Sequence, residues 1–354
     1  MTYLLAFTFI WLAQPMDTAK VYQSPEAVSG DYLALPHAIG FHSDGRLFVA
    51  DAKQSRIFVW DKAGKYLHIF SQKGEGPGEL QFPTCLTVQG DRVWVTDGSQ
   101  RLHIFSADGE FVKSVPINCI ARVLVAVDAK TALIGARALN PRDNRNEMAF
   151  TRLDIESGGK TEIKSWPNNT VIGVEDGKFR WKAFGDDIDV QKEPGGAIYF
   201  GFSQDPVLYA LGPKEQSKEA IHLNIPLQPP TSDEREFIRE MTFPGNKGQR
   251  FSLGKNTNWI WDFSQPKAIY THFLIKGEKL LLVLTPLGSI QGIGGAYSRG
   301  SYFIVDRGTG KPISRGAFEF PEDSLIFFED QRILGFILTD DGQFSIRELR
   351  LEGF

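Results

Sequence analysis

The chain has 354 residues, of which 42% are hydrophobic and 23% are charged, so it can bury a large core as one big domain or two smaller ones. Its formal net charge of −4 argues against the basic face that a general nucleic-acid binder carries, and the sequence contains no basic tract. We therefore expect no nucleic-acid partner.

The N-terminal segment contains an apolar run, residues 4–13, of the length found in secretory leaders, although no Lys or Arg precedes it. The run is too short to cross a bilayer as a helix. The pattern predicts a signal peptide over residues 1–19, no membrane span, and a mature protein in the periplasm or outside the cell. The two cysteines, Cys85 and Cys119, allow either one disulfide or two reduced thiols, and they are too few for a cysteine-based zinc cluster.

An internal repeat begins at residue 35. Aligning residues 35–70 with residues 82–115 superposes Asp51 on Asp97 and Arg56 on Arg101, with a period of about 45 residues. Apolar residues alternate over short runs in both units, and Asp-Gly and Ala-Gly turns separate the runs. Each unit therefore predicts four β-strands, which is the composition of one propeller blade.

These two units resemble NHL repeats, and the chain as a whole is similar to six-bladed β-propellers of the NHL or TolB-like group. The resemblance implies one all-β domain over residues 20–354, with six blades of four strands each. It is carried by Pro36, Gly45, the run LFVAD at 47–51, Arg56, the run FVWD at 58–61, Gly64 and the connector ending in GEGPGELQFP.

The later blades follow from strand patterns alone. Residues 122–166, 186–226 and 270–320 each hold four alternating apolar runs, whereas residues 324–354 hold only three. We expect residues 19–24 to supply the missing outer strand of the last blade. Closure of this kind removes the open sheet edges that an unclosed array would expose.

The glycine-rich stretch GEGPGEL, residues 74–80, has two interpretations. A phosphate-binding loop would have to open a helix, whereas a strand pattern follows Leu80. The glycines and the proline instead predict a sharp crossing from the rim of one blade to the inner strand of the next.

Every long connection is predicted on one face of the propeller, which we call the insertion face. Its segments are residues 138–147, 167–185, 227–267 and 286–300, and loops of such length usually carry function. Residues 231–243 predict one short helix, with Thr231 as the N-cap and Glu234 completing a capping box. Its apolar stripe is expected to seal the helix onto the propeller, or else to bind a partner.

The first residues of the inner strands meet at the channel mouth on the insertion face. Their polar character predicts a ligand site, although propeller channels also hold water without any ligand. The candidate residues are His37, Thr84, Arg122, Asp187 or Asp189, Tyr270 or His272, and Asp323. A second candidate lies in the insertion 227–267, where Arg250 and other cations accompany Trp259 and Trp261, a combination suited to an anionic ligand.

The sequence favours binding over catalysis. It has no HxH, HExxH or GxSxG motif. We therefore expect a monomer without a cofactor that binds a small molecule, a glycan, or a peptide or protein. The alternative implied by the resemblance is a metal-dependent lyase or lactonase holding Ca or Zn with His37, Asp187, His272 and Asp323, although the full ligand set of those enzymes is not found here. A plugged channel would instead favour a purely structural interaction module.

Overall fold

The computed structural model describes residues 17–139, 146–167, 171–175, 178–182, 188–193, 195–203, 205–211, 217–225, 229, 232, 235–236, 242–244, 250–252, 259–262, 269–284, 299–319, 324–340, 342–351 and 353–354. Within these ranges no helix has the length and apolar character needed to cross a bilayer. One four-residue helix, α1 (Glu26–Ser29), precedes the first blade.

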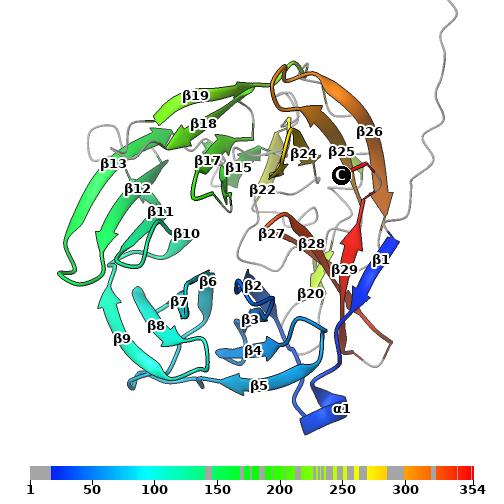
Figure 1. Cartoon of the computed structure of the whole chain (residues 1–354). Coiled ribbons are helices and arrows are strands. Elements are labelled where there is room, and N and C mark those ends of the chain that lie inside the picture. The colour runs from blue at the N-terminus through cyan, green and yellow to red at the C-terminus, as the bar shows by residue number, and fades with distance from the viewer. Residues whose placement is uncertain are drawn as a thin grey trace, which may run out of the picture.

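The described strands form a ring of six four-stranded antiparallel sheets, each of which is one blade of a β-propeller (Figure 1). In blades 1 to 5 the strands follow one another along the chain from the axis to the rim. Blade 1 contains β2 (Pro36–Phe41), β3 (Leu47–Asp51), β4 (Arg56–Trp60) and β5 (Tyr66–Phe70), and blade 2 contains β6 (Pro83–Gln89), β7 (Arg92–Asp97), β8 (Arg101–Ser106) and β9 (Phe111–Pro116). Blade 3 contains β10 (Ala121–Ala126), β11 (Thr131–Leu139), β12 (Asn146–Asp154) and β13 (Lys160–Pro167), and blade 4 contains β16 (Ile188–Lys192), β17 (Ile198–Phe202), β18 (Val207–Leu211) and β19 (Ser217–His222). Blade 5 contains β23 (His272–Lys276), β24 (Lys279–Leu284), β25 (Arg299–Asp306) and β26 (Pro312–Glu319), and blade 6 contains β27 (Leu325–Glu329), β28 (Arg332–Leu338) and β29 (Phe344–Arg350).

The ring is closed by the N-terminal strand β1 (Asp17–Val21), which pairs with β29 and completes blade 6. Just beyond β1, the backbone N–H of Gln23 donates to the carbonyl of Gly64 in blade 1 at 2.7 Å. The N-terminal segment therefore joins the last blade to the first. The predicted six-bladed fold is confirmed, but β1 lies two residues earlier than the expected strand at 19–24. Its first three residues fall within the predicted leader.

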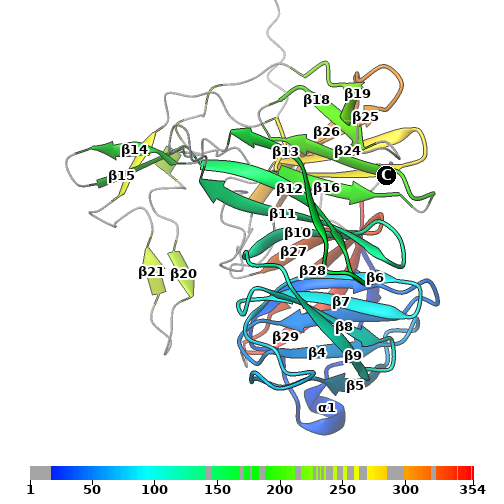
Figure 2. The ribbon, with the colours of Figure 1, turned by 90° about the vertical axis from the view of Figure 1, so that its left-hand side faces the viewer.

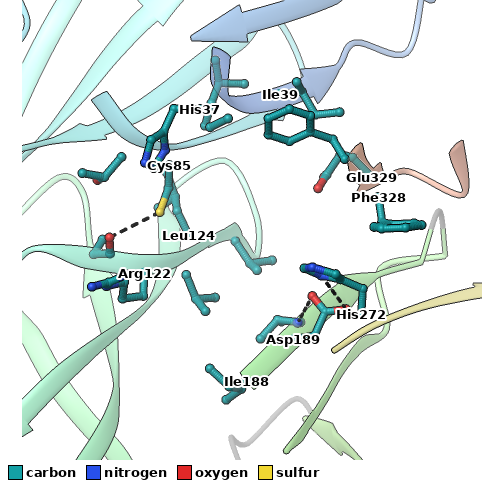
Figure 3. Close-up of a pocket in the computed structure, with 18 of the residues that line it drawn as sticks. His37, Ile39, Cys85, Arg122, Leu124, Ile188, Asp189, His272, Phe328 and Glu329 are labelled. Carbon is teal, nitrogen blue, oxygen red and sulfur yellow. Dashed lines mark hydrogen bonds and ion pairs between the residues drawn. The ribbon is translucent and has the colours of Figure 1, made fainter. Parts of the chain in front are cut away.

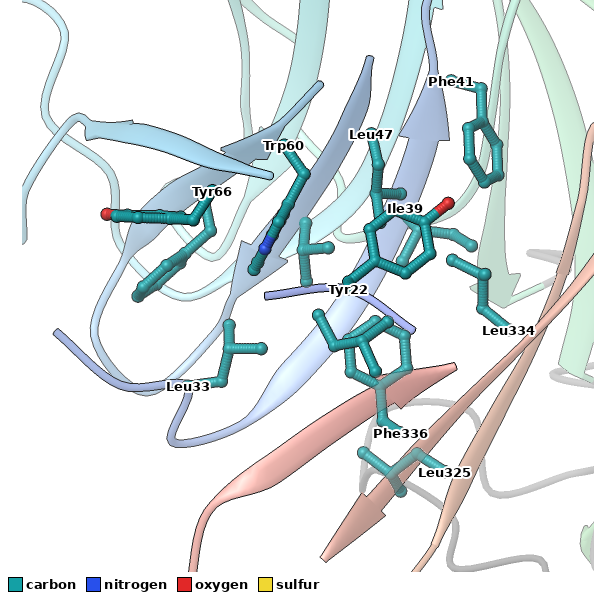
Figure 4. Packing of buried hydrophobic residues seen from close by; sticks show 13 residues of the cluster. Tyr22, Leu33, Ile39, Phe41, Leu47, Trp60, Tyr66, Leu325, Leu334 and Phe336 are labelled. Atoms are coloured by element: carbon teal, nitrogen blue, oxygen red, sulfur yellow. The ribbon is translucent and has the colours of Figure 1, made fainter. Parts of the chain in front are cut away.

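The hydrophobic core is divided among the blade interfaces. Each buried apolar cluster of the described residues combines side chains from two neighbouring blades. Figure 4 shows the cluster between blades 6 and 1, where the fully buried Trp60 lies near Tyr66 and Leu33. The indole Nε1–H of Trp60 donates to the carbonyl of Gln23 at 2.8 Å. This packing fixes each blade against the next and so holds the inner strands around the axis.

Asp51 and Asp97, which the internal repeat superposes, perform the same task in blades 1 and 2. Asp51 Oδ2 accepts the backbone N–H groups of Ala34 and Leu35 at 2.5 and 2.8 Å, and Asp97 Oδ2 accepts that of Gln81 at 2.7 Å. Both carboxylates are buried, and each binds the segment that leads into the inner strand of its own blade. The repeated aspartate is thus explained by blade architecture rather than by ligand binding.

The glycine-rich segment 74–80 is a connector, as predicted. Glu79 Oε2 accepts the backbone N–H of Gly76 at 2.8 Å, so a side chain of the segment itself occupies that donor. Gly78 has a φ of 80°, which favours glycine, and the chain then enters the strand β6.

The insertions carry two small sheets that the sequence patterns did not predict. Strands β14 (Val171–Glu175) and β15 (Lys178–Lys182) form a hairpin, and β15 pairs in parallel with β22 (Trp259–Asp262). Strands β20 (Thr242–Pro244) and β21 (Arg250–Ser252) form a second hairpin. Figure 2 shows both sheets on one side of the ring, which agrees with the predicted insertion face.

The helix predicted over residues 231–243 lies largely outside the described residues. Ser232, Arg235 and Glu236 are helical, but Thr242 already belongs to β20, so the predicted C-terminal boundary was wrong. The β-branched Thr242 and the aromatic Phe243 before Pro244 favour an extended backbone at this point.

Candidate functional site

A cavity of about 400 Å³ lies on the axis of the ring, and the inner strands of all six blades contribute to its lining (Figure 3). Its size is within the usual range for small-molecule sites. Because the inner strands run side by side in the same direction, the second residues of β2, β6, β10 and β16 fall at the same end of the channel. These residues are His37, Thr84, Arg122 and Asp189, and all four line the cavity.

The structure brings five of the predicted mouth residues together. The cavity is lined by His37, Thr84, Arg122, Asp189 and His272. Of the two candidates in blade 4, Asp189 is therefore the lining residue, and Asp187 lies outside the described residues, as does Asp323.

Tyr270 is not part of the cavity lining, contrary to its prediction as a mouth residue. Its side chain is fully buried in the cluster between blades 4 and 5, and its ring centroid lies 5.9 Å from that of Phe273. The chain bends at Thr271, just before β23, and the Tyr270 hydroxyl occupies the space left by the missing side chain of Gly201.

The second predicted site is divided between the two small sheets. Arg250 begins β21, whereas Trp259 and Trp261 belong to β22, where they pair with Phe179 and Trp181 of β15. The structure describes the strands that contain these residues but not the placement of their side chains, so the anion-binding role of Arg250, Trp259 and Trp261 stays a prediction.

One wall of the cavity combines a cation with exposed apolar side chains. Arg122 lies on β10, and Ile120, just before this strand, is 52% exposed at the cavity edge. Phe82 is 42% exposed, and its ring lies edge-on to the imidazole of His37 with centroids 5.7 Å apart. Phe82 has a φ of 55°, an uncommon conformation for a bulky residue, and its N–H donates to Ser55 Oγ at 3.1 Å. The fold thus holds an aromatic ring at the mouth at a conformational cost.

Another wall carries a buried carboxylate beside an imidazole. Asp189 Oδ2 accepts the backbone N–H of Phe273 at 2.7 Å, which also links blade 4 to blade 5. His272 Nδ1 lies 4.0 Å from the same oxygen, and its ring stacks on Phe328 with centroids 5.1 Å apart. Burial raises the pKa of Asp189 to about 7 and lowers the pKa of His272 to about 4. The imidazole is therefore neutral near pH 7, so this contact is not an ion pair there.

Glu329, the last residue of β27, is a lining residue that the sequence analysis missed. Burial and, to a smaller extent, the nearby carboxylates of Asp330 and Asp189 raise its pKa to about 8. The sequence could have indicated Glu329 as a lining residue, because it is a charged residue at the end of an otherwise apolar inner strand. Phe82 and Ile120, directly before the strands β6 and β10, were missed because the blades were aligned on His37, which selects Thr84 and Arg122, the residues two positions later.

Between these polar groups the lining is largely apolar. It includes Ile39, Leu86, Leu124, Ile326 and Phe328 (Figure 3).

Opposite the insertion face, Lys192 joins the far ends of three inner strands. Its ammonium group donates to Gln89 Oε1 of blade 2 at 2.8 Å and to the Ala126 carbonyl of blade 3 at 2.6 Å. Lys192 itself belongs to blade 4, so its side chain fastens three blades around the channel.

Thiol and metal chemistry receive little support within the described ranges. Cys85 and Cys119 are free, and burial raises the pKa of the Cys85 thiol to about 11, which makes it a poor nucleophile. The described residues contain no group of three or more His, Cys, Asp or Glu side chains placed to hold a metal ion. The calcium or zinc site stays a prediction, because two of its four residues, Asp187 and Asp323, are not described.

Comparison with known proteins agrees with this architecture. The model of the DUF5128 family, described as a 6-bladed beta-propeller, matches residues 33–91, which cover blade 1 and the inner strand of blade 2. No curated protein matches the sequence. The fold therefore defines a six-bladed β-propeller with a cavity on its axis.

Solved structures share the fold at low sequence identity. A candidate exported protein from Bacteroides fragilis NCTC 9343 superposes with a TM-score of 0.60 at 12% identity, covering 97% of this chain and 96% of that one. A DUF4221 family member from Bacteroides vulgatus superposes with a TM-score of 0.54 at 12% identity, covering 96% and 97%. A virginiamycin B lyase from Staphylococcus aureus reaches a TM-score of only 0.42 at 12% identity, covering 89% and 95%, too low to bear on activity.

Proposed function

We propose that the protein is an exported binding protein that takes a small organic ligand into the axial cavity from the insertion face. The observation that carries this proposal is the combination of a cavity of about 400 Å³ with exposed apolar side chains, Phe82 and Ile120, at its edge. A channel that merely held water would have no need of apolar groups in contact with solvent at its mouth.

Export is supported by the apolar N-terminal run and by the structural similarity to a candidate exported protein. The position of β1 adds a constraint on processing. Asp17 and Thr18 pair with Arg350 and Leu349, so removal of a leader has to occur before Asp17 if the closing strand is to stay whole.

Binding can be tested with 8-anilinonaphthalene-1-sulfonate, an apolar dye whose sulfonate suits Arg122. We expect one dye molecule to bind per chain, because the axial cavity combines an apolar lining with the cation of Arg122. Replacing Ile120 by Asp places a negative charge at the mouth and is expected to weaken dye binding about tenfold. Fluorescence titration gives the affinity, and calorimetry gives the stoichiometry.

Ile313 provides a matched control, because it is 56% exposed on β26, the outer strand of blade 5. Ile313→Asp makes the same chemical change on the rim and should leave dye affinity unchanged. Equal weakening by both substitutions, or no weakening by either, would rule out the cavity as the binding site.

A further inference from the structure

We propose that the ligand of the cavity is a short hydrophobic peptide, bound with its carboxylate at Arg122 and its ammonium group at Glu329. This inference rests on the proposed function and names the ligand class of the same site.

Arg122 and Glu329 lie on opposite sides of the channel. Arg122 is the second residue of β10 in blade 3, whereas Glu329 is the last residue of β27 in blade 6, and these blades face each other across the ring (Figure 1). The two residues also lie toward opposite ends of their inner strands. A ligand that meets both groups therefore lies obliquely along the channel.

Much of the lining near these two residues is apolar. Figure 3 shows Leu124 near Arg122, and Ile39 and Phe328 near Glu329. The exposed rings and methyl groups of Phe82 and Ile120 extend the apolar lining to the mouth. This arrangement suits a molecule with hydrophobic side chains in the middle and opposite charges at its ends.

The positions of Arg122 and Glu329 along their strands favour a peptide over a free amino acid as the ligand. A five-residue strand such as β27 spans roughly 13–16 Å, so groups near opposite ends of inner strands are separated by several ångströms at least. The ammonium and carboxylate groups of a free amino acid are attached to the same carbon atom, so a peptide spans the channel between these two residues more readily than a free amino acid does. An extended peptide adds about 3.4 Å per residue, so two or three residues separate its terminal charges sufficiently.

The chemistry at each end matches a peptide terminus. The Arg122 guanidinium can bind a carboxylate with two parallel hydrogen bonds. Glu329 is largely protonated near pH 7 in the empty cavity, but an ammonium group beside it would favour its ionised form, which can then accept hydrogen bonds from that ammonium group. The Asp189 carboxyl is close enough to interact electrostatically with Glu329. A fatty acid offers these two carboxyl groups no ammonium donor, and a glycan would place many hydroxyl groups against the apolar lining.

The test is calorimetry with the probes leucyl-phenylalanine and leucyl-leucyl-phenylalanine, each also as its N-acetyl form and its C-terminal amide. We expect at least one free peptide to bind and to displace the dye, and either modification to weaken binding at least about tenfold. Glu329→Gln should abolish the preference for the free peptide over its N-acetyl form. Arg122→Gln should abolish the preference over the amide.

Glu278→Gln and Arg350→Gln are the matched controls, because both residues are exposed and lie away from the cavity lining. Both should keep the full preference for free termini, and circular dichroism checks that every variant is folded. Equal binding of free and modified peptides would overturn the inference. Dye binding that depends on Ile120 but is not displaced by any peptide would also overturn it and would leave the proposed function intact. A failure of the dye test itself would contradict the proposed function.

Discussion

Replacing Trp60 by Ala is expected to lower the free energy of unfolding by about 3–5 kcal/mol, because the substitution removes a fully buried indole from a packed core. The indole packs within the cluster that joins blades 6 and 1, and it lies 5.7 Å from the ring of Tyr66. It also binds the Gln23 carbonyl, so its loss should release the segment that closes the ring. Chemical denaturation measures the change in stability.

Limited proteolysis distinguishes loss of closure from general destabilisation. Lys20 lies within β1, where its ammonium is 3.2 Å from Glu348 Oε2, and trypsin cleaves after Lys20 only when β1 leaves the sheet. We expect Trp60→Ala to accelerate this cleavage under native conditions.

Trp94→Ala is the matched control, because Trp94 is equally buried but belongs to the cluster between blades 2 and 3. This substitution should lower the free energy of unfolding by a similar amount without accelerating cleavage at Lys20. If the two variants show equal cleavage rates at equal stability, Trp60 has no special part in closure.

The sequence predicted the fold well because the blades are built from local patterns. Alternating apolar residues and Gly-containing turns specify each hairpin over a few residues, and the repeated aspartates Asp51 and Asp97 bind backbone groups only about sixteen residues away. Strand order then follows chain order in five blades. Closure by β1 was predictable because blade 6 has one strand too few, but its register depends on pairing with residues more than three hundred positions later.

The candidate site was predicted only in part, for equally physical reasons. Register along the inner strands identified His37, Thr84, Arg122 and His272, because equivalent positions in a ring of parallel inner strands share one end of the channel. Tyr270 was wrongly predicted to line the cavity because the chain bends at Thr271, between Tyr270 and the inner strand β23. The sheet of β14, β15 and β22 was missed because its parallel pair joins residues about eighty positions apart, and no local pattern encodes that pairing.

Glu329 is expected to make the stability of the protein fall as the pH rises, and Glu329→Gln should remove that fall. The carboxyl of Glu329 has a pKa of about 8 in the folded chain against an ordinary value of 4.5, so the folded state binds more protons than the unfolded state between these values. The stabilisation of the folded state is therefore complete below pH 4.5 and is lost as the pH rises through 8. The difference corresponds to at most about 5 kcal/mol, and partial exposure reduces it to about 2–4 kcal/mol.

Urea unfolding at pH 5 and pH 9 measures this effect. At pH 5 both proteins are neutral at residue 329 when folded and should differ little, whereas at pH 9 the glutamine variant should be more stable by about 2–4 kcal/mol. The nearby Asp330, Arg332, Asp189 and His272 are present in both proteins, so their own titrations largely cancel in the difference. The exposed Glu278→Gln serves as a control and should show no such divergence. Parallel stability profiles for the wild type and Glu329→Gln would mean that water reaches Glu329 freely, and the burial inferred for this carboxyl would then be wrong.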